Sequence, residues 1–110
     1  PRSTLFPYTT LFRSLVGQMI QLFIQLAPDR LSMLRRATEG ADRLRVRAHA
    51  RKFQCAAQSI AAQQIADAAL QLDEAAARED WETAANTLRQ IESEVERLSG
   101  AHLAAPPSTH

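Results

Sequence analysis

The sequence RLRVRAHARKFQCAAQSI, residues 43–60, is the most informative stretch of this chain. Its apolar residues are separated by four, three, four and three positions, and they are Val46, Ala50, Phe53, Ala57 and Ile60. Residues with this spacing lie along one side of an α-helix, whereas those of a half-buried β-strand alternate. The pattern therefore predicts a helix over residues 43–57 that buries one face against other helices.

Two later segments repeat this pattern. The first stripe consists of Ile65, Ala69, Leu72 and Ala76, and the second of Ala84, Leu88, Ile91, Val95 and Leu98. We expect a turn over residues 58–62 with Ser59 as a helix N-cap, and we expect Asp80 to cap the last helix. Gly100 is expected to end that helix, because glycine is a common stop signal, and the tail 101–110 is expected to be disordered.

The residues before position 43 also favour helix. Apolar residues recur from Leu15 to Leu34, and Pro28 is expected either to kink this segment or to begin a new helix. Gly40 is expected to end it, and Asp42 to cap the helix that follows. Four amphipathic helices with short connections predict an all-α fold, an antiparallel up-down four-helix bundle over residues 15–100.

The first fourteen residues, PRSTLFPYTTLFRS, differ in composition from the rest of the chain. They include the only tyrosine and no acidic residue. We interpret residues 1–14 as the translation of a sequencing-library adapter fused in frame to the natural sequence, which then begins near Leu15. Removing Arg2 and Arg13 from the thirteen basic residues leaves eleven against twelve acidic residues. No charge excess therefore points to nucleic acid.

Composition narrows the class of protein further. Of the 110 residues, 45% are hydrophobic and 23% are charged, which suits one packed domain. Three glycines and 5% aromatic residues argue against a β-sandwich or barrel. No apolar run is long enough to span a membrane. A single cysteine excludes an internal disulfide and a cysteine-based zinc site.

No catalytic motif is visible. The histidines, His49, His102 and His110, form no pair at helical spacing and no cluster with carboxylates, and glycine-rich phosphate loops are absent. We therefore expect no metal, no cofactor and no enzymatic turnover. The basic residues of the 43–52 segment lack interleaved aromatic residues, so we interpret them as a solvated helix face and expect no nucleic-acid partner. They are Arg43, Arg45, Arg47, Arg51 and Lys52.

From about Met19 to Leu98 the chain resembles histidine-containing phosphotransfer (Hpt) domains. Residues 22–42, LFIQLAPDRLSMLRRATEGAD, resemble the opening helices of that family, and residues 72–98, LDEAAAREDWETAANTLRQIESEVERL, resemble its closing hairpin. The resemblance implies a four-helix bundle that passes a phosphoryl group between aspartates of receiver domains in a phosphorelay. It also implies a cytoplasmic protein whose partners are response-regulator receivers, hybrid histidine kinases or both.

The Hpt signature, roughly His-x-Leu/Phe-Lys-Gly-Ser-Ala-x-x-Ile-Gly-Ala, falls without gaps on residues 51–62, RKFQCAAQSIAA. The matching residues are Phe53, Ala57, Ile60 and Ala62. The three chemical positions differ. Arg51 replaces the phosphoacceptor histidine, Gln54 the lysine that neutralises the phosphoryl group, and Cys55 the glycine that leaves room for the receiver.

His49 is the alternative acceptor, but its use requires a two-residue insertion within a helix. At about 100° per residue, Arg51 lies about 140° from the centre of the buried face, whereas His49 lies about 60° from it, on the flank. An acceptor must be accessible to its partner, so the periodicity favours Arg51 at that position. Active phosphotransfer through His49 and a generic helical interaction or dimerisation module remain as alternatives.

Arginine cannot replace histidine chemically, because its guanidinium stays protonated and has no lone pair to attack phosphorus. Arg51 therefore predicts a degenerate Hpt domain that binds a receiver without transferring phosphate. The acidic phosphorylation pocket of a receiver would attract Arg47 and Arg51. We name the exposed side of this helix the docking face, and it consists of Leu44, Arg47, Arg51, Gln54, Cys55 and Gln58.

Overall fold

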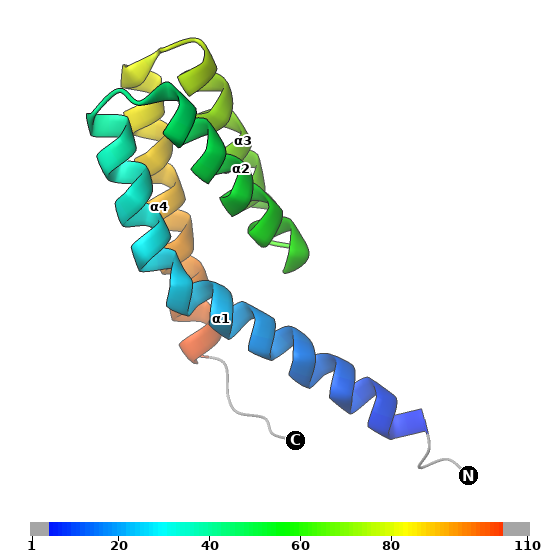
Figure 1. Ribbon diagram of the computed structural model, residues 1–110. Helices are drawn as coiled ribbons and strands as arrows, with labels where there is room; N and C mark the ends of the chain where they lie inside the picture. Colours follow the sequence, from blue (N-terminus) through cyan, green and yellow to red (C-terminus); the bar gives the residue numbers. More distant parts are fainter. Residues whose placement is uncertain (1–4, 105–110) are drawn as a thin grey trace.

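The computed structural model describes the backbone of residues 5–104 and the side chains of residues 15–102. Regular structure in that range is helical, and the helices are α1 (Leu5–Glu39), α2 (Arg43–Ser59), α3 (Gln63–Ala77) and α4 (Trp81–Ala104). Each helix packs against its neighbours in the chain, and α4 also packs against α1, which closes a four-helix bundle (Figure 1). The predicted all-α up-down bundle is confirmed.

Helix α1 is the longest of the four, and its N-terminal part extends beyond the bundle (Figure 1). It begins at Leu5, inside the segment 1–14, and the origin of that segment stays a prediction. Pro28 lies within α1, so the expected alternative of a new helix at Pro28 is wrong. A proline inside a helix removes one backbone hydrogen bond and bends the helix, and α1 changes direction in this region. Within the described residues, none of the helices combines the length and the apolar character that a membrane crossing needs.

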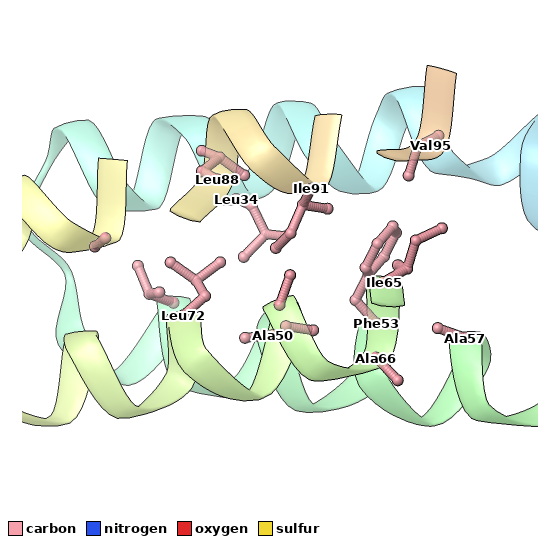
Figure 2. Close-up of a cluster of buried hydrophobic side chains, with 14 of the residues drawn as sticks. Leu34, Ala50, Phe53, Ala57, Ile65, Ala66, Leu72, Leu88, Ile91 and Val95 are labelled. Carbon is pink, nitrogen blue, oxygen red and sulfur yellow. The ribbon is translucent and has the colours of Figure 1, made fainter. Parts of the chain in front are cut away.

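The core is built from the predicted apolar stripes. The four stripe residues within α2 are all buried, and Phe53 contacts Phe23 of α1 with ring centroids 5.2 Å apart. Figure 2 shows Phe53 in one cluster with Leu34 of α1, Leu72 of α3 and Ile91 of α4. Helix α3 buries more alanines than its stripe predicts, because Ala66, Ala68 and Ala75 are also buried. Side chains from all four helices therefore share one continuous core.

Each of the three connections between helices contains one residue other than glycine in the left-handed conformation. The φ angle is 51° at Ala41, 58° at Ala61 and 56° at Glu79. The turns are closed by the same type of hydrogen bond, as when the N–H of Ala62 donates to the carbonyl of Ala57 at 2.9 Å. The three-residue turns thus reverse the chain with the same backbone geometry, and each contains one strained residue.

The two predicted aspartate caps are confirmed. Asp42 accepts from the N–H of Arg45 at 3.2 Å, and Asp80 accepts from the N–H of Thr83 at 3.2 Å. The hydroxyl of Thr83 also donates to Asp80 at 2.7 Å. This hydroxyl, then the Thr83 amide, and finally the charge of Arg78 hold the pKa of Asp80 below its ordinary value. Both caps satisfy N–H groups that the first turn of a helix leaves without a partner.

Two predicted helix ends are wrong. Helix α2 includes Ser59, whose hydroxyl donates to the carbonyl of Ala56 instead of capping α3. The N-cap of α3 is Ala62, which has no capping side chain. Helix α4 continues through Gly100 to Ala104, so residues 101–104 are helical, while 105–110 lie outside the described residues. A single glycine costs a helix only about 1 kcal/mol, which is too little to end it here.

Candidate functional site

The docking face lies on the outer side of α2, as the spacing predicts. Leu44, Cys55 and Gln58 are exposed, and Arg47 and Gln54 are half-buried. The side chain of Arg51 is 61% exposed, and that of Leu44 is the most exposed large apolar one in the described range. This surface combines positive charge with an accessible apolar side chain. Its role in binding stays a prediction.

Two arginines of the docking face share one carboxylate of α3. The Nε–H of Arg47 donates to Oδ1 of Asp73 at 2.9 Å, and the Nε–H of Arg51 donates to Oδ2 at 3.2 Å. The side chain of Asp73 is only 10% exposed, whereas those of Arg47 and Arg51 are 30% and 61% exposed. The cluster therefore consists of a buried carboxylate and two more exposed guanidinium groups. Its two positive charges exceed its one negative charge.

Sequence reasoning missed Asp73. The residue directly follows Leu72 of the apolar stripe, which places a carboxylate at the edge of the buried face of α3. A buried acid needs a partner of opposite charge. The basic residues of α2, together with the helical hairpin that α2 and α3 form, were the signal that could have paired Asp73 with Arg47 or Arg51.

His49 lies on a different side of α2 from the Asp73 cluster. It is half-buried and borders a groove between α1 and α2, and the other lining residues are Met33, Arg36, Ala37, Gly40, Asp42 and Arg45. This agrees with the flank position expected from the helical angle. His49 and Arg51 therefore belong to separate surfaces of α2.

The described part of the chain offers few residues for metal binding or for other reactive chemistry. Between residues 15 and 102, no three His, Cys, Asp or Glu side chains gather closely enough to hold a metal ion. Cys55 is exposed and free. The arrangement that stands out chemically is the arginine pair on Asp73, in which two guanidinium groups share one carboxylate.

Comparison with known families agrees with the fold. The model of the Hpt domain family matches residues 18–101. The chain belongs to the Hpt domain family. Its structure is similar to that of histidine-containing phosphotransfer protein B (HptB) from Pseudomonas aeruginosa PAO1, with a TM-score of 0.78 and 19% sequence identity over 94% of this chain and 90% of that chain. No curated protein matches the sequence.

Family membership identifies the chain as an Hpt-type domain of phosphorelay signalling. Hpt domains are phosphoryl carriers and not turnover enzymes, and they interact with histidine kinases and response regulators. The likeness to HptB shows the shared bundle. The residue types at the positions where an Hpt domain does its chemistry decide what this member can do.

Proposed function

We propose that this chain is an Hpt domain that binds the receiver domain of a response regulator without accepting its phosphoryl group. The observation that carries the proposal is that Arg51, which the ungapped alignment puts at the acceptor position, is exposed on the outer side of α2. A guanidinium stays protonated and offers no lone pair. Imidazole, in contrast, has a nitrogen with a free lone pair near neutral pH. The side chain at this position is therefore accessible to a partner but does not form a phosphoryl bond.

The turn after α2 supports this register. The Hpt signature has a glycine just before its final alanine, and the ungapped alignment puts that glycine at Ala61. Ala61 has a φ of 58°, the left-handed conformation that glycine adopts without strain. An alignment that starts at His49 without an insertion would move the glycine to Ser59, which is the last residue of helix α2. The backbone therefore favours the ungapped alignment on Arg51 over an ungapped alignment on His49.

The charge of α2 supports a receiver as the partner. Helix α2 contains five basic residues and no acidic one. The phosphorylation pocket of a receiver is acidic, so the two surfaces are complementary in charge, which speeds encounter and fixes orientation. Leu44 adds an apolar contact beside Arg47 and Arg51. A receiver within a hybrid histidine kinase presents the same chemistry, and the proposed setting is cytoplasmic.

Binding of the whole 110-residue chain to receiver domains from its source organism tests the proposal by calorimetry. We expect a receiver to bind, and we expect Arg51→Glu to weaken binding about tenfold or more. Arg45→Glu is the matched control, because Arg45 is also exposed on α2 but pairs with Asp42 outside the docking face. Failure of every receiver to bind, or an equal loss with both variants, contradicts the proposal.

A restored acceptor gives a second test. In the double variant Arg51→His, Gln54→Lys, two of the three chemical positions of the signature return. We expect this variant to take label from a phosphorylated receiver that the wild-type chain binds without becoming labelled. A double variant that binds the receiver and stays unlabelled counts against the ungapped register.

Phosphotransfer through His49 is the second candidate function, and one observation favours it. The groove beside His49 also contains Arg36 and Arg45, whose charges would offset those of a phosphoryl group. This candidate predicts an acid-labile phosphohistidine that His49→Ala abolishes.

A further inference from the structure

We propose that Arg47 and Arg51, anchored on Asp73, form a binding site for a phosphoryl dianion, so that the chain binds a phosphorylated receiver more tightly than an unphosphorylated one. The choice of a receiver as the carrier of that group rests on the proposed function. The phosphoryl site itself rests only on the geometry of the three side chains.

The anchoring leaves most donors of both arginines unused. Asp73 accepts only the Nε–H of Arg47 and the Nε–H of Arg51. Over residues 15–102, the side chain of neither arginine makes any other hydrogen bond or ion pair. A guanidinium has five N–H groups in a rigid fork, so the terminal amino groups of both side chains remain for a further acceptor.

The two guanidinium groups are close together, because the two oxygens of one carboxylate contact both. Arg47 and Arg51 are also one turn apart on the same face of α2. Asp73 offsets one of their two positive charges, which leaves the cluster positive. A phosphoryl group offers several oxygens and a double negative charge, and arginine forks bind such groups through paired hydrogen bonds.

The remaining arginines at the start of α2 are engaged elsewhere. Arg45 pairs with Asp42 at 3.4 Å, and Arg43 pairs with Glu79 of the turn after α3 at 3.8 Å. The anchor of the proposed site is different in kind, because Asp73 is buried. Because Asp73 already holds both guanidinium groups in place, Arg47 and Arg51 lose less conformational freedom when they bind an anion. This favours binding.

Binding at this site involves no covalent step. The phosphoryl group stays on the receiver aspartate, because Arg51 has no electron pair to form a bond to phosphorus. Arg51 thus occupies the position from which a histidine would attack and instead donates hydrogen bonds to the phosphoryl oxygens. The chain would retain phosphorylated receivers without discharging them.

The site is tested first with inorganic phosphate as the probe and the full chain, by following the arginine Nε–H resonances in NMR spectra. We expect saturable shifts of the Arg47 and Arg51 resonances that potassium chloride at the same ionic strength does not produce. Arg51→Gln should weaken phosphate binding about tenfold or more, and Arg45→Gln should leave it unchanged. Shifts that do not saturate, or that potassium chloride reproduces, overturn the site.

The source of the phosphoryl group is tested with a receiver domain that binds the chain, with and without beryllium trifluoride as a mimic of aspartyl phosphate. We expect the loaded receiver to bind about tenfold more tightly, and we expect Arg51→Gln, but not Arg45→Gln, to remove this preference. Equal affinity for both states overturns the preference and leaves the proposed function intact. Binding to neither state overturns the proposed function, and the phosphate titration then decides the site by itself.

Discussion

The two sides of α2 retain different parts of the Hpt pattern. On the buried side, Phe53 and Ala57 match the signature and are 1% and 0% exposed. On the outer side, the proposed alignment puts Arg51, Gln54 and Cys55 at the positions of the three residues that phosphotransfer needs. In the proposed alignment, one helix therefore keeps the packing pattern of its family along one face and departs from the chemical pattern along the other.

This difference shows that packing and chemistry constrain separate residues. Side chains on opposite faces of a helix have different neighbours, so an outer residue can change without disturbing the core. Surface substitutions usually alter stability by less than about 0.5 kcal/mol, whereas truncation of a core side chain costs several times more. A chain can therefore keep the Hpt fold when its outer face changes, and function must be argued from the outer face.

The largest expected effect comes from breaking the buried side. Phe53→Ala should lower the free energy of unfolding by about 3–5 kcal/mol, because it leaves a cavity beside Phe23 in the shared core. Gln54→Ala, one position further along α2, should change it by less than about 0.5 kcal/mol. Urea denaturation followed by circular dichroism measures both. Similar losses in the two variants would remove the distinction between the faces.

The next effect concerns the contact between the outer face and α3. Asp73→Asn should lower the free energy of unfolding by about 1–3 kcal/mol, because it leaves the half-buried Arg47 without its charged partner. Glu79→Gln is the control, since the Arg43–Glu79 pair is exposed on both sides and should contribute less than about 1 kcal/mol. Equal effects of the two substitutions, measured by denaturation, would mean that Asp73 is no special anchor.

A smaller effect tests the turn that fixes the register. Ala61→Gly should raise the free energy of unfolding by about 1 kcal/mol, because glycine relieves the left-handed strain, although it also frees the unfolded chain. Ala48→Gly is the control, because Ala48 is exposed within α2 and glycine there should cost about 1 kcal/mol. If both substitutions destabilise the protein, Ala61 is not the signature glycine position and the alignment on Arg51 loses its support.

The smallest effect belongs to a titrating group outside both faces. Because the pKa of Asp80 is lowered in the folded protein, its charged form adds stability above the ordinary value of 3.8, and this is lost as the pH falls through the lower folded value. Wild type should therefore be slightly more stable than Asp80→Asn at neutral pH. Thermal melts as a function of pH should show the difference closing below pH 3.8. A difference in stability between the two proteins that widens on acidification would contradict the lowered pKa of Asp80.

The sequence predicted the parts of the molecule that depend on local periodicity. Phe53, Leu72 and Ile91 could be assigned to the core because apolar spacing reports which face of a helix is buried. Helix ends were less predictable, because a lone signal such as Gly100 competes with the packing of the residues around it. The sequence indicates that Asp73 needs a basic partner, but the identity of that partner depends on the mutual rotation of two helices, which only the assembled bundle sets.

The most direct test of the central claim is transfer of labelled phosphate from a phosphorylated receiver to the full wild-type chain, with His49→Ala assayed beside it. The account predicts that the receiver binds and that neither chain acquires acid-labile label, because Arg51 cannot accept a phosphoryl group. Label on the wild-type chain that disappears in His49→Ala would contradict it and would make the flank histidine the acceptor.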